Sequence, residues 1–157
     1  MKIERFEDIE AWKEARKLVK DIYGCFRNSK DIGFKSQIQR ASLSIMSNIA
    51  EGFDRGSNRE FIQFLIIARG SASEVRSILY SALDLDYIDK QTFEKILEKC
   101  GKITNLLNGF IRYLKDSARK CCTYLGSSYI TFTLNIEPLT VLFGCLSVAV
   151  ADDNLEH

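Results

Sequence analysis

The chain has 157 residues, 46% of them hydrophobic, and its 22 basic and 21 acidic side chains leave a net charge of +1. A chain of this length can bury a core without disulfide or metal staples, so one domain is expected. The near-neutral balance excludes a protein that is basic throughout, as dedicated nucleic-acid binders often are. The charge is nevertheless uneven, because residues 1–120 hold every basic side chain and carry +5, whereas residues 121–157 carry −4.

Cysteine usage indicates a compartment but no site. The five cysteines are odd in number and lack the CxxC spacing, and the charged N-terminus does not have the form of a secretory signal. We therefore expect a reducing, cytoplasmic setting. The longest apolar run, residues 139–151, is shorter than the roughly 18–20 residues that a membrane-spanning helix needs. No membrane span is predicted.

Two amphipathic helices are predicted in the first third of the chain. Over residues 6–26, apolar side chains, Tyr23 among them, recur at spacings of three and four, and charged side chains fill the other face. A polar stretch that ends at Gly33 follows. A second helix is expected over about residues 34–50, where Gly52 and Gly56 would end it.

Two further helices complete the predicted fold. Residues 57–60 read SNRE, the form of a capping box, and should open a third helix that runs to about Leu85. A fourth apolar stripe begins near Asp89 and ends within residues 115–120, where basic side chains suit the negative helix terminus. The connections are short and the first proline is Pro138, so residues 1–120 are predicted to form an all-α, antiparallel up-down four-helix bundle.

The composition changes at the C-terminal tail, residues 121–157. This segment is rich in β-branched and aromatic residues, lacks Lys and Arg, and has turn signals at residues 126–128 and 137–138. It is expected to be non-helical, with short strands by propensity. The sequence LEH at 155–157 resembles the start of a vector-encoded histidine tag, so a frameshifted or vector-encoded extension is favoured over a native appended segment.

The predicted second helix carries an organised polar stripe opposite its apolar face. A helical wheel places the following residues within one narrow arc: Gln37, Arg40, Ser44, Asn48 and Glu51. The stripe has two interpretations. It is either a recognition face or a hydrogen-bonded network that fixes the helix register or a subunit contact.

The predicted third helix is apolar on two sides at its start. Opposite its core face lie two isoleucines and three small residues, assigned here to a subunit interface: Ile62, Ile66, Gly70, Ser73 and Ser77. Small side chains would let a second backbone approach closely, which predicts homo-oligomerisation. The alternative is close packing inside a single bundle.

Four arginines are the candidate nucleic-acid-binding residues. Arg55, Arg59 and Arg69 cluster in sequence around the turn between the second and third helices, and Arg40 lies on the preceding helix. If several copies assemble, their positive field would grow and would suit a polyanion such as RNA or DNA. The alternative is an ordinary solvated face.

Catalysis has little support. The single histidine, His157, is at the C-terminus, so no histidine-based acid–base pair, triad or metal cluster can be built within the bundle. The carboxylates lack the pattern of di-iron bundles. The glycines at 52 and 56 follow no strand and precede no Lys-Ser or Lys-Thr, so they do not form a phosphate loop. We expect a protein that is not an enzyme and that holds no metal or cofactor.

Four blocks of sequence carry a family resemblance: FEDIEAW at 6–12, QIQRA at 37–41, NIAEG at 48–52 and FLIIARGS at 64–71. Together they resemble the four-helix bundle proteins encoded in intervening sequences of bacterial 23S rRNA genes, sometimes labelled a ribosomal protein family. The resemblance covers about residues 3–116 and does not extend into the tail.

This resemblance implies a four-helix bundle that assembles as a homopentamer. The chain is also similar to the accessory variability protein of diversity-generating retroelements, a pentameric bundle that engages nucleic acid and a reverse transcriptase. It departs from the family in having Gln39 where an arginine commonly precedes Arg40, which removes one positive charge. The leading hypothesis is a bundle oligomer that binds RNA or DNA, and the alternative is an adaptor that docks a partner such as a reverse transcriptase.

Overall fold

The structure is a computed structural model that describes the backbone of residues 3–128 and the side chains of residues 3–117. The chain divides into two units, residues 1–121 and residues 122–157. After a short 3₁₀ turn, η1 (Phe6–Asp8), come four helices: α1 (Glu10–Cys25), α2 (Ile32–Asp54), α3 (Asn58–Asp84) and α4 (Lys90–Ser128). The described part of the chain has no strand, which confirms the predicted all-α class.

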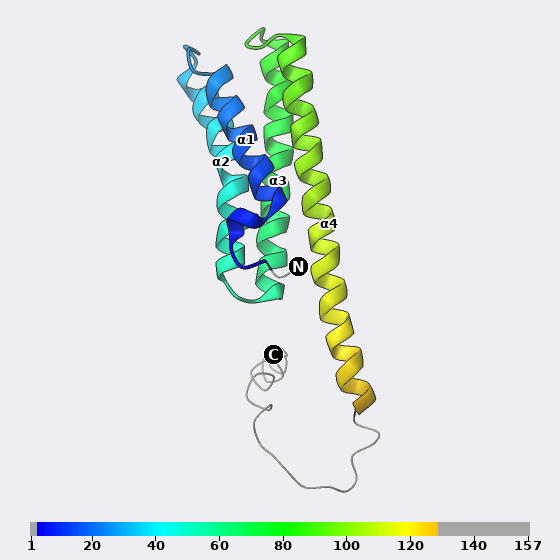
Figure 1. Cartoon of the computed structure of the whole chain (residues 1–157). Coiled ribbons are helices and arrows are strands. Elements are labelled where there is room, and N and C mark those ends of the chain that lie inside the picture. Colours follow the sequence, from blue (N-terminus) through cyan, green and yellow to red (C-terminus); the bar gives the residue numbers. More distant parts are fainter. Residues whose placement is uncertain (1–2, 129–157) are drawn as a thin grey trace, which may run out of the picture. The chain divides into compact units, whose positions relative to one another are not determined.

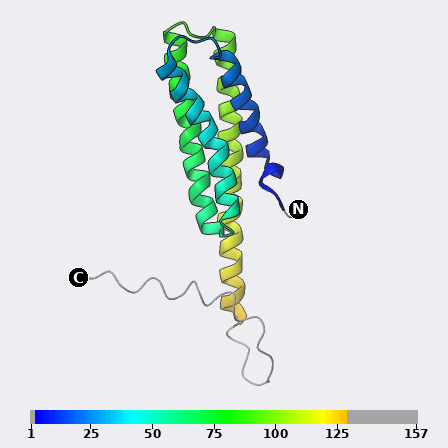
Figure 2. The same cartoon turned by 90° about the vertical axis from the view of Figure 1, so that its left-hand side faces the viewer.

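The four helices lie alongside one another as an antiparallel up-down bundle (Figures 1 and 2). The α1–α2 and α3–α4 connections lie at one end, and the α2–α3 turn lies at the other. Rings on α3 and α4 pack edge to face, with the Phe61 and Phe110 centroids 5.2 Å apart. An ion pair between Asp21 and Lys99 joins α1 to α4.

The core is a single apolar cluster to which every helix contributes a row of buried side chains. Its fully buried large members are Leu18, Ile22, Phe26, Ile38, Ile45, Ile49, Leu65, Val75, Leu79, Ile96, Ile103 and Leu107. These positions follow the predicted helical spacing. Tyr23 was predicted on the apolar face of the first helix, but its side chain is 42% exposed.

The first helix begins later than its apolar pattern predicts. Residues 6–8 form the 3₁₀ turn, and Ile9 caps α1 in an extended conformation (φ −70°, ψ 119°). The Phe6 ring packs against the Trp12 ring with their centroids 5.2 Å apart. The apolar spacing therefore continues through a segment that folds back on α1 and does not extend it.

The second helix passes through Gly52 and ends at Asp54, which corrects the predicted end near residue 50. A β-carbon on Gly52 would lie 2.5 Å from the Phe64 Cβ and 2.9 Å from the Phe61 Cδ2. This glycine therefore allows α2 and α3 to approach closely and does not break the helix. Gly56, at φ +69°, is the residue that turns the chain.

The third and fourth helices begin near the predicted residues. The capping box at residues 57–60 is not formed, because the Ser57 side chain makes no cap hydrogen bond. Asp89 does cap α4, since its Oδ1 accepts from the Thr92 amide at 2.6 Å.

The fourth helix continues to Ser128, past the end predicted within residues 115–120. Without a proline to stop it, an established helix adds residues more easily than it starts anew. The predicted turn at residues 126–128 thus lies in the last turn of α4. The strands predicted beyond it lie outside the described residues. No helix within residues 3–128 is both long and apolar enough to cross a membrane.

Candidate nucleic-acid interface

The four predicted arginines lie in different surroundings. At the C-terminal end of α2, Arg55 donates from Nη2 to Glu51 Oε1 at 2.7 Å, and its Cζ lies 5.3 Å from the centroid of the Phe64 ring. Arg69 is half-buried on α3 and donates to Asn108 Oδ1 on α4 at 2.8 Å. Two of the four guanidinium groups are thus engaged within the protomer.

The other two arginines remain open to a ligand. Arg40 on α2 and Arg59 in the first turn of α3 are exposed, and neither makes an ion pair or side-chain hydrogen bond within the described residues. The hypothesis that all four arginines form one nucleic-acid surface stays a prediction.

The middle of the polar stripe on α2 is a hydrogen-bonded network. The Ser44 and Ser71 hydroxyl groups share a hydrogen bond of 2.9 Å between α2 and α3. Asn48 donates from Nδ2 to the Ser44 carbonyl at 2.7 Å and to its hydroxyl at 3.0 Å. These contacts favour the structural interpretation for Ser44 and Asn48.

The residues assigned to a subunit interface divide into two groups. Ile62 and Ile66 are half-buried and pack against the core of their own protomer. Gly70, Ser73 and Ser77 are exposed, and a β-carbon on Gly70 would meet nothing within 4 Å. The first group is partly explained by packing inside the bundle, and the role of the second in assembly stays a prediction.

A cationic surface that the sequence analysis did not single out runs along α1. We call it the basic face; it consists of Lys13, Arg16, Lys17, Lys20 and Arg27, all of them exposed. Arg27 lies just past the C-terminal end of the helix. The spacings of three and four between the first four residues place them on one side of a helix.

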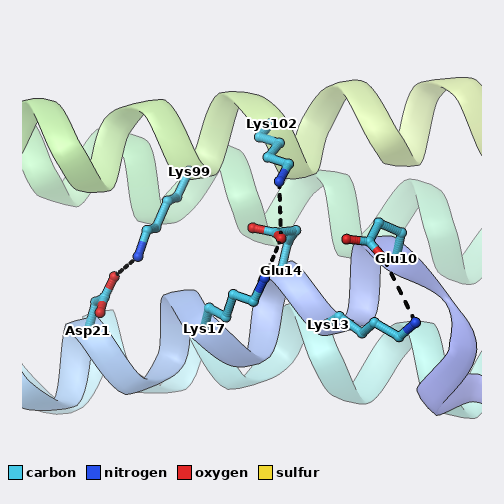
Figure 3. Close-up of polar contacts among 7 residues, drawn as sticks. All are labelled: Glu10, Lys13, Glu14, Lys17, Asp21, Lys99 and Lys102. Carbon is cyan, nitrogen blue, oxygen red and sulfur yellow. Dashed lines mark hydrogen bonds and ion pairs between the residues drawn. The ribbon is translucent and has the colours of Figure 1, made fainter.

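The acidic residues of α1 divide between the basic face and α4: Glu10 Oε2 lies 3.8 Å from Lys13 Nζ, whereas Glu14 and Asp21 turn toward α4 (Figure 3). Glu14 Oε1 lies 2.7 Å from Lys17 Nζ and 3.1 Å from Lys102 Nζ, and Asp21 pairs with Lys99. Lysines of α4 thus pair with two of the acids of α1. Within the basic face, Lys13 and Lys17 have acidic partners, and Arg16, Lys20 and Arg27 make no ion pair within the described residues.

Glu14 is the one charged side chain among the buried residues of the described part, with 5% exposure. Hydrogen bonds from Lys17 and then from Lys102 hold the pKa of this carboxyl below its usual range. Glu14 therefore stays ionised near neutral pH and fixes α1 against α4 at a defined register.

The sequence contained a signal for the basic face, in the spacing of its lysines and arginines. Acidic residues alternate with these basic residues along α1, and the sequence does not show which acidic side chains form ion pairs with another helix. The pairing of Asp21 with Lys99 joins residues 78 positions apart. This contact depends on the packing of α1 against α4.

The thiols within the described residues are poorly suited to nucleophilic chemistry. Burial raises the pKa of the Cys100 thiol to about 12. Cys25 is exposed as a residue, but partial desolvation of its thiol, followed by the charge of Asp21, also raises the pKa of that thiol. No group of three His, Cys, Asp or Glu side chains within residues 3–117 could hold a metal ion.

Comparisons with known proteins agree with the fold. Residues 7–109 match the family model described as 23S rRNA-intervening sequence protein. Among solved structures, the chain is similar to a protein of unknown function of the S23 ribosomal protein family from Bacteroides thetaiotaomicron VPI-5482. The similarity has a TM-score of 0.61 and 27% identity, and covers 64% of this chain and 97% of that one. Comparison with curated proteins gives no match.

Proposed function

The chain belongs to the 23S rRNA-intervening sequence protein family, and on that premise we propose that it is a non-enzymatic, homo-oligomeric, cytoplasmic helical bundle that binds RNA or DNA through phosphates. Family membership alone assigns no activity, since the similar protein from Bacteroides thetaiotaomicron is itself of unknown function. The observation that supports the proposal is the basic face of α1.

The dimensions of the basic face suit a nucleic-acid backbone. From Lys13 to Cys25, where α1 ends, the helix rises about 18 Å at 1.5 Å per residue. That length matches about five phosphates of one strand of a duplex at 3.4 Å per phosphate. Three of its cations, Arg16, Lys20 and Arg27, make no ion pair within the described residues, so binding a phosphate would break no existing pair.

Assembly would strengthen this surface. We propose a homopentamer in which the exposed Gly70, Ser73 and Ser77 of α3 meet a second copy. Each copy would bring its own basic face together with the exposed Arg40 and Arg59, and the fields of the copies would add. Light scattering on the full chain tests the assembly; a monomer at all concentrations would contradict it.

Filter binding of the full chain to RNA and DNA, from low to high salt, tests the proposed function. Releasing counterions from about five phosphates predicts a slope of log affinity against log salt near −3.5 for a single strand. The double variant Lys13→Gln with Arg16→Gln should bind more weakly, with a slope shallower by about 1.4.

The matched control is Arg76→Gln with Arg112→Gln, which removes the same charge from exposed positions of α3 and α4. This control should bind nearly as the parent does. Absence of binding to RNA and DNA even at low salt would refute the proposed function.

An adaptor that docks a partner protein such as a reverse transcriptase is the second candidate. The outer side of α3 supports it, because Ile67 is 51% exposed next to the open Gly70. The double variant Arg55→Ala with Arg59→Ala separates the candidates. Lost nucleic-acid binding with unchanged melting favours the first, whereas lost assembly or stability with binding retained favours the adaptor.

A further inference from the structure

A hollow of about 560 Å³ opens between the end of α1 and the start of α2. It is lined by Lys20, Tyr23, Gly24, Arg27, Lys35 and Gln39. Three of these side chains are cations and none is acidic. The hollow therefore joins the C-terminal part of the basic face to the neighbouring helix.

A second hollow, of about 420 Å³, lies on the other side of α1, toward α4. It shares Lys20 and Gly24 with the first hollow and adds Lys95. Its one acidic lining residue, Asp21, is already paired with Lys99. The two hollows therefore form a positively charged track that crosses α1 at Gly24.

Gly24 has no side chain to block the path between the two hollows. It is exposed in the last turn of α1, and an added β-carbon would meet nothing within 4 Å. Its φ is not positive, since Gly56 is the one glycine with positive φ within the described residues. Neither the backbone conformation nor close packing therefore requires a glycine at position 24, and a glycine there destabilises the helix. The missing side chain would, however, let a ligand pass over α1 at this point.

Tyr23 provides an aromatic surface in the first hollow. Its side chain is 42% exposed and pairs with no other aromatic ring among the described side chains. A cationic groove with an accessible aromatic ring is the combination by which proteins hold single strands, because the cations track phosphates and a base stacks on the ring. A duplex keeps its bases stacked on one another and cannot use this ring.

The first hollow is formed before any ligand arrives. Lys35 Nζ donates to the Arg27 carbonyl at 2.8 Å, which ties the start of α2 to the end of α1. Lys35 is thus partly a structural residue. Lys20 and Arg27 are therefore the cations available to phosphates.

We propose that a single-stranded phosphodiester chain, RNA or DNA, crosses α1 at Gly24, with its phosphates on Lys20 and Arg27 and a base stacked on Tyr23. The inference rests on the proposed function and specifies the class of nucleic acid and its path. The competing explanation is that these cations only compensate the negative C-terminal end of α1.

Fluorescence anisotropy of the full chain with labelled 12-nucleotide oligouridylate, its thymidine DNA counterpart and a duplex of the same length tests the inference. The key variant is Gly24→Gln, which fills the crossing without changing charge. Its matched control is Gly109→Gln on α4, another exposed helical glycine with nothing within 4 Å of an added β-carbon.

We expect the parent to bind single strands at least tenfold more tightly than the duplex. Gly24→Gln should lose at least tenfold in affinity, and Gly109→Gln should stay within twofold of the parent. Tyr23→Leu should lose about 5- to 160-fold in affinity for single strands, the range that 1–3 kcal/mol per stacked base corresponds to. Whichever of the two single strands, RNA or DNA, binds more tightly is identified as the natural type of ligand.

Two other results have distinct meanings. If the parent binds nucleic acid but Gly24→Gln and Tyr23→Leu bind as the parent does, the track is refuted and the proposed function stands. If the parent binds no strand and no duplex at low salt, the proposed function fails together with the track. Circular dichroism of each variant verifies that the fold is kept.

Discussion

The α2–α3 interface and the α1–α4 interface share one apolar core but differ in the contacts that accompany it. Between α2 and α3, the bare Gly52 lets two backbones approach, and the hydroxyl groups of Ser44 and Ser71 share a hydrogen bond of 2.9 Å. No ion pair joins α2 to α3 within the described residues. Between α1 and α4, the apolar contacts are joined by two ion pairs, Asp21 to Lys99 and Glu14 to Lys102 at 3.1 Å.

This difference predicts that stability depends on steric fit at the α2–α3 interface and on charge at the α1–α4 interface. Steric fit acts over tenths of an ångström and responds little to salt or pH. Ion pairs tolerate small movements but weaken as salt rises or as a carboxylate is protonated. Four measurements test this contrast.

The largest effect is expected from Gly52→Ala. The new methyl group would lie 2.5 Å from the Phe64 Cβ, so α2 and α3 must separate. We expect the free energy of unfolding to fall by about 3 kcal/mol, with equal loss at low and high salt. Urea denaturation followed by circular dichroism measures it. Gly109→Ala, which meets no neighbour, should instead stabilise the protein by up to about 1 kcal/mol.

Glu14→Gln is expected to have the next largest effect. It removes the charge that Lys17 and Lys102 share and leaves both cations near a neutral amide. Because those lysines are largely exposed, we expect a loss of about 1–2 kcal/mol at low salt. The loss should shrink at 1 M salt. A loss that does not depend on salt would show that the α1–α4 interface relies on shape, as the α2–α3 interface does.

The pH dependence of stability should follow Glu14. Its pKa in the folded protein is lowered by Lys17 and Lys102, so its contribution is complete above the unfolded value of about 4.3 and disappears as pH falls through the folded value. The difference in unfolding midpoint between the parent and Glu14→Gln should therefore close below about pH 4. A difference that is constant from pH 7 to pH 3 would contradict the role assigned to this carboxylate.

Ser71→Ala is expected to have the smallest effect. The partner hydroxyl, Ser44, would keep its hydrogen bond from Asn48 at 3.0 Å, so no buried polar atom is left without a partner. The free energy of unfolding should fall by less than about 1 kcal/mol. A loss as large as that of Gly52→Ala would show that hydrogen bonding, more than close approach, determines the α2–α3 interface.

The fold could be predicted further than the candidate site. Apolar spacing located four helices and most of the core, because burial of one face leaves a period of 3.6 residues in any sequence. Gly52 was wrongly predicted to end the second helix, since the sequence does not distinguish a glycine that breaks a helix from one that lets two helices approach closely. Tyr23 was misread for a related reason: a residue at the edge of an apolar stripe faces solvent or core depending on where the next helix lies.

The sequence by itself determined the all-helical class, the number of helices and the family, because each of these is recorded in local spacing and in short blocks of residues. Only the tertiary structure decided which charges of α1 face the solvent. Glu14 and Asp21 meet lysines of α4 that are remote in sequence, and that pairing leaves the other face of α1 positive. Electrostatic character is a property of surfaces, and a surface is defined only when distant segments have packed.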